Sequence, residues 1–168
     1  MMPISKGHGA HAGPGPWRRY AAAAAAVAAA ATAGSVAVDP DGAWYRNLRK
    51  PPWQPPQWAF AAVWTPLYAS LAFAFGHALG RSRGPERAKT VAGFAANLAL
   101  NAGWSWLFFG CRSPRAALAG ILLLDLGNAG LIRRTARTDP TAARVLLPYA
   151  AWCAFATALN ASISRRNP

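Results

Sequence analysis

Residues 51–80 read PPWQPPQWAFAAVWTPLYASLAFAFGHALG, a stretch of 30 residues that contains no Asp, Glu, Lys or Arg. A helix crosses the hydrocarbon core of a bilayer with about 20 mostly apolar residues, at a rise of about 1.5 Å per residue. Four further windows of similar size lie elsewhere in the chain: 20–38, 90–111, 116–132 and 145–164. Of the 18 basic and 5 acidic residues, only Asp125 lies inside any of these windows. This segregation of charge along the chain is the pattern of a multi-pass membrane protein.

The connectors between the windows are short and rich in Pro, Gly and charge, which favours antiparallel neighbouring helices. The sequence therefore predicts an all-α fold, an integral membrane bundle of five transmembrane helices. One domain is expected over residues 17–168, after a disordered tail over residues 1–16. The helices are expected at about 18–38, 57–80, 89–110, 114–135 and 140–164.

The 168-residue chain has a net charge of +13, which on its own is compatible with nucleic-acid binding. The charges lie in the connectors, however, so membrane lipid is the expected partner and nucleic acid is not. The side that would share the N-terminus holds 11 of the basic residues against 7, which favours a cytoplasmic N-terminus. For the Ala-rich first window, a cleaved signal peptide or targeting segment after Lys6, Arg18 and Arg19 is the alternative to a retained helix.

Aromatic and amide side chains recur at helical spacing on three of the expected helices. Each set lies on one helix face: Trp64 and Tyr68; Asn97, Asn101, Trp104 and Phe108; Tyr149, Trp152, Ala156 and Asn160. Because polar side chains in membrane helices turn toward protein partners, these faces are expected to converge inside the bundle. They either hold the helices together or line an aromatic cavity suited to a flat, largely apolar ligand.

Three other positions are candidates for function. Asp125 is the one acid inside a window, and an intramembrane acid is a candidate proton or cation site. Gly76 and Gly80 form a GxxxG pair, which suits a helix contact or a dimer face. The His and Cys residues lack metal-ligand spacing, and no catalytic motif is present, so no metal site and no catalytic residue are expected.

Several uncommon residues occur in an order that resembles the TspO/MBR family of tryptophan-rich sensory proteins and translocator proteins. The matching motifs are Trp44-Tyr45, Lys50-Pro51, Pro55-Pro56, Val63-Trp64-Thr65-Pro66-Leu67-Tyr68, Asn101-Ala102-Gly103-Trp104, Phe108-Phe109-Gly110 and Leu147-Pro148-Tyr149-Ala150-Ala151-Trp152. The resemblance runs from about residue 44 to the C-terminus. It implies that residues 20–38 are retained as the first of five helices.

This resemblance implies a homodimer with a ligand cavity among the helices, beneath the first loop. Family ligands are porphyrins and related tetrapyrroles, synthetic benzodiazepine-like compounds and, in animals, cholesterol. Porphyrin or heme would be the ligand, and no resident cofactor is implied. The implied ligand-binding residues are Trp44 at the cavity mouth and, within the cavity, Trp64, Tyr68, Asn101, Trp104, Trp152 and Ala156. In some bacterial members the counterparts of Trp64 and Trp152 are linked to light-dependent porphyrin breakdown.

We therefore expect a tetrapyrrole-binding membrane protein with a role in sensing, transport or disposal. We do not expect an enzyme, with light-dependent breakdown of porphyrin as the one activity left open. The alternatives are a proton-coupled transporter of amphiphilic cations that uses Asp125, a scaffold that oligomerises through Gly76 and Gly80, and a cholesterol or lipid translocator. The C-terminal cholesterol motif of animal members requires a Tyr that residues 159–165 lack, which argues against the steroid. A bacterial membrane, a mitochondrial outer membrane and an endomembrane all fit.

Overall fold

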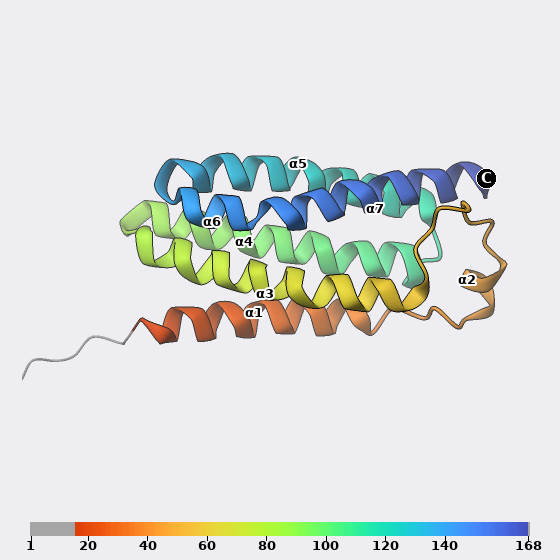
Figure 1. The fold of residues 1–168 in the computed structure, drawn as a ribbon, viewed down its shortest axis with the longest axis horizontal. Helices are drawn as coiled ribbons and strands as arrows, with labels where there is room; N and C mark the ends of the chain where they lie inside the picture. Colours follow the sequence, from red (N-terminus) through yellow and green to blue (C-terminus); the bar gives the residue numbers. More distant parts are fainter. Residues whose placement is uncertain (1–15, 168) are drawn as a thin grey trace, which may run out of the picture.

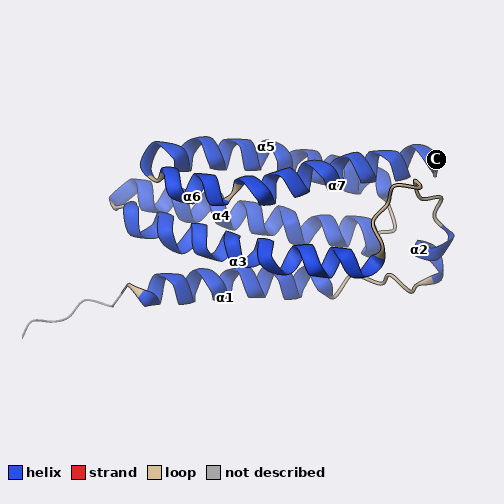
Figure 2. Cartoon of the chain, viewed as in Figure 1, coloured by secondary structure: helices blue, strands red, loops and turns tan. Residues whose placement is uncertain are grey.

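The computed structural model describes residues 16–167, which form a bundle of helices that lie along one common axis (Figure 1). Figure 2 shows helices joined by loops, with no strand in the part of the chain that the structure describes. The elements are α1 (Trp17–Ser35), α2 (Ala43–Asn47), α3 (Gln57–Arg81), α4 (Gly84–Ser105), the π-helical turn η1 (Trp106–Gly110), α5 (Pro114–Thr138), α6 (Pro140–Val145) and α7 (Leu147–Arg166). The all-α prediction is confirmed. The disordered tail was predicted for residues 1–16, which except for Pro16 lie outside the described residues.

Three helical stretches in residues 16–167 combine the length and the hydropathy that a membrane span requires: 57–81, 114–138 and 140–166. The protein is thus a multi-pass membrane protein. Helices α1 and α4, of 19 and 22 residues, lie beside these spans along the same axis. They are less apolar, because α1 is mostly Ala and α4 begins with a charged first turn. The count of five spans stays a prediction.

The helix expected over residues 140–164 is divided into α6 and α7, which meet at Leu146. Pro148 causes the division, because it has no N–H to donate to the carbonyl of Arg144, four residues earlier. Helical hydrogen bonding is present again at Ala150, whose N–H donates to the Leu146 carbonyl at 3.0 Å. A second irregularity ends α4, where the Cys111 N–H donates to the Trp106 carbonyl at 2.7 Å, the hydrogen bond of a π-helical turn.

At the end of the bundle that holds the 81–84 turn, Asp139 joins three elements. Its carboxylate caps α6 by accepting from the Ala142 N–H at 3.1 Å and also contacts the ring nitrogen Nδ1 of His77 on α3. Burial acts to raise the pKa of Asp139, but the hydrogen bonds from His77 and Ala142, with the nearby charges of His77 and Arg81, lower it overall. The ionised carboxylate therefore stabilises this helix junction.

Gly76 and Gly80 lie on the face of α3 that packs against α1. A Cβ atom at Gly76 would lie 3.0 Å from the Tyr20 Cα and would overlap the Tyr20 ring, while one at Gly80 would overlap the Arg19 guanidinium. The GxxxG pair thus allows two helices of the same chain to approach closely. A homodimer remains a prediction.

Candidate ligand-binding cavity

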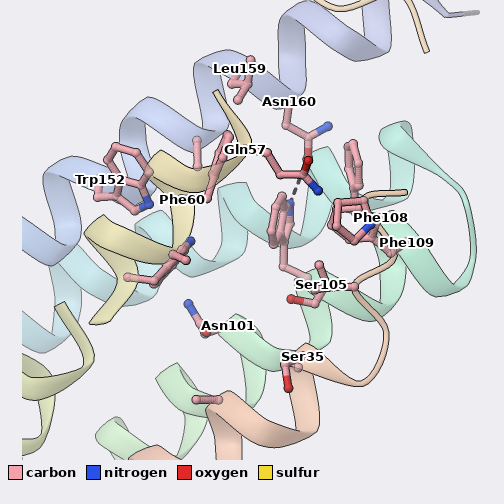
Figure 3. A pocket seen from close by; sticks show the side chains of 18 of the residues that line it. Ser35, Gln57, Phe60, Asn101, Ser105, Phe108, Phe109, Trp152, Leu159 and Asn160 are labelled. Atoms are coloured by element: carbon pink, nitrogen blue, oxygen red, sulfur yellow. Dashed lines mark hydrogen bonds between the residues drawn. The ribbon is translucent and has the colours of Figure 1, made fainter. Parts of the chain in front are cut away.

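A cavity of about 430 Å³ lies among α1, α3, α4, η1 and α7, next to the connector that joins α1 to α3 (Figure 3). Its volume lies within the ordinary range for small-molecule sites, about 300–1,000 Å³. Six of the predicted binding residues line it, namely Trp64, Tyr68, Asn101, Trp104, Trp152 and Ala156. They come from α3, α4 and α7, so the three aromatic faces of the sequence meet around one space.

Trp44, the seventh predicted binding residue, is not on the cavity wall. Its ring meets the Phe108 ring edge-on, with the centroids 5.6 Å apart, and Phe108 in turn stacks on Trp104 at 5.6 Å. Phe108 does line the cavity. Trp44 therefore supports the wall from behind, while its neighbour Tyr45 reaches the cavity.

The connector from α1 to α3 lines one end of the cavity with Val38, Pro40 and Tyr45. The Tyr45 hydroxyl accepts from Gln54 Nε2 at 3.2 Å, and burial raises the pKa of Tyr45 although the Gln54 hydrogen bond partly opposes this. The Lys50 ammonium lies 4.2 Å from the centroid of the Tyr45 ring. Local contacts with Gln54 and Lys50 thus hold Tyr45 in place at this end of the cavity.

A second attachment fixes this connector to the C-terminal end of α7. The Asn167 side chain accepts from the Arg49 N–H at 3.0 Å and donates to the Arg49 carbonyl at 3.1 Å. These two hydrogen bonds join residues that are 118 positions apart in the sequence. They hold the connector across the end of the bundle.

Eight of the residues that line the cavity are aromatic. Trp64 stacks on Tyr68 with centroids 5.1 Å apart and an interplanar angle of 25°, and Phe60 meets Trp152 at 6.1 Å. The sequence analysis did not single out Phe60, although it lies one helical turn before Trp64 and so shares its face. It also missed Phe109 and the small residues of α1, because an Ala-rich helix shows no preferred face.

The wall is connected to a buried chain of polar side chains that links four helices. Tyr68 donates to Asn101 Oδ1 at 3.0 Å, and Asn101 Nδ2 donates to the Tyr149 hydroxyl at 3.2 Å. That hydroxyl donates to Asn97 Oδ1 at 3.0 Å, and Asn97 Nδ2 donates to Asn128 Oδ1 at 2.6 Å. The sequence left two roles open for the amides, holding helices together or lining a cavity. Asn97 holds helices together, whereas Asn101 both bonds to its neighbours and borders the cavity.

The two cavity tryptophans on α4 and α7 differ in how their indole N–H groups are used. Trp104 Nε1 donates to Asn160 Oδ1 at 3.0 Å. Trp152 Nε1 is buried and has no hydrogen-bond partner within residues 16–167. Figure 3 shows this nitrogen on the side of Trp152 that faces the other labelled residues. An unpaired buried donor costs about 1–3 kcal/mol, so an acceptor group that came within hydrogen-bond distance of this N–H would remove that cost.

Asp125 lies elsewhere, in the contact between α5 and α7. Its Oδ2 is 2.6 Å from the Thr157 hydroxyl, which is also 3.1 Å from the Cys153 carbonyl. It is not a wall residue of the cavity. Across the described part of the chain there is also no group of three or more His, Cys, Asp or Glu that could hold a metal ion.

The polar chain predicts a strong effect on stability at its centre. Tyr149→Phe removes the hydroxyl that pairs with both Asn97 and Asn101, leaving two buried polar atoms without a partner, so unfolding should become easier by about 1–3 kcal/mol. Thermal unfolding in detergent, followed by circular dichroism, measures this. The control is Tyr20→Phe, because the Tyr20 hydroxyl has no hydrogen bond to a described residue. Equal melting of the two variants would show that the chain does not stabilise the bundle.

Comparison with known proteins gives consistent matches over most of the chain. The pattern of the TspO/MBR family matches residues 21–166. Tryptophan-rich protein TspO of Chlorobaculum tepidum is 38% identical over 81% of this chain and 87% of its own length. The translocator protein of Homo sapiens is 37% identical over 80% of this chain and 81% of its own length. The tryptophan-rich sensory protein of Cereibacter sphaeroides is 34% identical over 90% of this chain and 92% of its own length.

Proposed function

Because the chain belongs to the TspO/MBR family, a family of membrane translocator and sensory proteins, we propose that it binds a tetrapyrrole in the aromatic cavity. The observation that carries this proposal is the wall itself. It combines flat rings on α3, α4 and α7 with one unused indole N–H, at Trp152. Sensing, transport or disposal of the ligand would follow from this binding.

The chemistry of a tetrapyrrole matches that wall. Its macrocycle is flat and apolar, so it can stack on Trp64 and Trp104, each such contact contributing about 0.5–1.5 kcal/mol beyond the buried area. Its ring substituents include acceptors that the Trp152 N–H can reach. Carboxylate groups at its edge suit the connector end of the cavity, where Arg46, Arg49 and Lys50 lie in sequence next to Tyr45.

The proposal is one of binding, with no catalytic residue and no resident cofactor. Porphyrin is the ligand, and the relatives are named as translocator or sensory proteins. A homodimer also belongs to this proposal. Asp125 is separated from the cavity wall, so it has no part in binding, and Asp125→Asn should leave porphyrin affinity unchanged.

A titration in the dark tests the assignment. We expect the detergent-purified protein to bind protoporphyrin saturably, as measured by the change in porphyrin absorbance and by quenching of Trp fluorescence. The double variant Trp64→Phe, Trp152→Phe should bind about tenfold more weakly, because two ring contacts are reduced and one donor is lost.

The matched control changes two tryptophans that lie outside the cavity. Trp17 and Trp58 are 68% and 72% exposed, so Trp17→Phe with Trp58→Phe should retain wild-type affinity in the absorbance measurement. Equal loss in both double variants, or no saturable binding by the wild type, would contradict the proposed ligand or its site. Repeating the titration after illumination then shows whether breakdown of the porphyrin depends on light.

A further inference from the structure

A second hollow, of about 320 Å³, lies between residues 93–100 of α4 and residues 127–137 of α5. We call it the α4–α5 groove. Glycines make it deep: a Cβ atom at Gly130 would meet no other atom within 4 Å, and one at Gly127 would meet only Leu100, at 3.7 Å. It shares no lining residue with the aromatic cavity.

Three arginines, Arg133, Arg134 and Arg137, line the end of the groove nearest the C-terminus of α5. The structure contains two ion pairs within residues 16–167, His77 with Asp139 and Lys89 with Glu86. None of the three guanidinium groups is therefore within ion-pair distance of a carboxylate in this region. Three unpaired, planar donor groups at one rim form a receptor for phosphate or carboxylate oxygens.

Glu86, in the first turn of α4, is the acid whose charge acts on this rim. It accepts from the Lys89 ammonium at 2.6 Å. The hydrogen bond and charge of Lys89 lower the pKa of Glu86, and the charge of Arg134 adds a smaller effect in the same direction. Because Lys89 already neutralises this carboxylate, the rim of the groove keeps a positive charge.

Toward the N-terminus of α5, the helix face that lines the groove carries an exposed leucine. Leu123 is 56% exposed, and it is followed along the same face of α5 by Gly127, Gly130, Arg134 and Arg137 at spacings of three and four residues. α5 is one of the candidate spans, so its exposed leucines lie at the depth of the acyl chains. The arginines in its last turns then lie at the depth of the headgroups.

We propose that the α4–α5 groove binds an anionic phospholipid, with the phosphate on Arg133, Arg134 and Arg137 and an acyl chain over Gly127 and Gly130. Basic pockets between membrane helices are suited to such headgroups. A second copy of this chain fits the groove less well. A symmetric contact through the same face would bring two sets of arginines together.

The test compares phosphatidylglycerol with phosphatidylcholine of the same acyl chains. Both are titrated into detergent-purified full-length protein, and bound lipid is counted by native mass spectrometry. We expect selective binding of phosphatidylglycerol that falls at least tenfold in the triple variant Arg133→Gln, Arg134→Gln, Arg137→Gln. The control triple variant, Arg18→Gln, Arg83→Gln, Arg144→Gln, removes the same charge from exposed positions at the same end of the bundle and should retain binding.

Gly130→Phe provides a second test that leaves every charge in place. A side chain at this position enters the open space of the groove, so it should displace the lipid while the melting temperature in lipid-free detergent does not fall. Equal loss in both triple variants, equal binding of the two lipids, or inorganic phosphate binding as tightly as the lipid would overturn the proposal. So would a Gly130→Phe variant that loses a dimer while its phosphatidylglycerol binding persists, because a second copy would then occupy the groove.

Discussion

Replacing Ala156 by Phe is expected to weaken protoporphyrin binding at least 100-fold, about 2.7 kcal/mol. Ala156 lies on α7 one helical turn after Trp152, on the wall of the cavity. The substitution places a benzene ring inside a space of about 430 Å³, where a planar ligand needs the full gap between the aromatic walls. The loss should greatly exceed that of the Trp64 and Trp152 changes, because those replace one ring by a smaller one.

Ala154 provides the matched control on the same helix. It is exposed on the outer side of the bundle, so Ala154→Phe adds the same ring where lipid or detergent surrounds it. Both variants are titrated with protoporphyrin by absorbance, and both are melted to show that they fold. If the two bind protoporphyrin with the same affinity, the ligand does not occupy this cavity, and the tetrapyrrole proposal loses its site.

Much of this site could be predicted because membrane helices present few choices. Stretches with no charge, or with Asp125 as their single charge, located α3, α5 and the C-terminal helix. Spacing of three and four residues then placed Trp64 with Tyr68, and Trp104 with Asn101, on common faces. Residue spacing does not predict which neighbouring helix or cavity a given helix face contacts. Asn97 shares the face of Asn101, yet it bonds to Asn128 and Tyr149 in the interior and lines the α4–α5 groove instead of the cavity.

The features that sequence reasoning missed have local physical causes. The π-helical turn over residues 106–110 reorients Phe108 and Phe109, and no residue preference in an aromatic run distinguishes such a turn from an α-helix. The Ala-rich α1 contributes Gly34 and Ser35 to the cavity, but its composition marks no face as buried. Trp44 was placed at the cavity mouth by resemblance alone; in the structure its neighbour Tyr45 lines the cavity, and a role of Trp44 in binding stays a prediction.

The second large effect is expected at Gly76, where the backbones of α1 and α3 lie close together. A Cβ atom there would lie 3.0 Å from the Tyr20 Cα, and backbone cannot move aside as a side chain can. Gly76→Leu therefore forces α1 away from α3, at a cost of about 3 kcal/mol or more in the free energy of unfolding. Because α1 forms one wall of the cavity through Ala31 and Gly34, porphyrin affinity should fall as well.

Gly103 separates this packing effect from the general effect of changing a helical glycine. A Cβ atom at Gly103 meets nothing within 4 Å, and a better helix former there should raise helix stability by up to about 1 kcal/mol. Gly103→Leu should thus melt at or above the wild-type temperature, whereas Gly76→Leu melts well below it. A Gly76→Leu protein that melts normally but changes from dimer to monomer would instead place the glycine pair at a contact between two chains. The α1–α3 contact would then be too loose to shape the cavity.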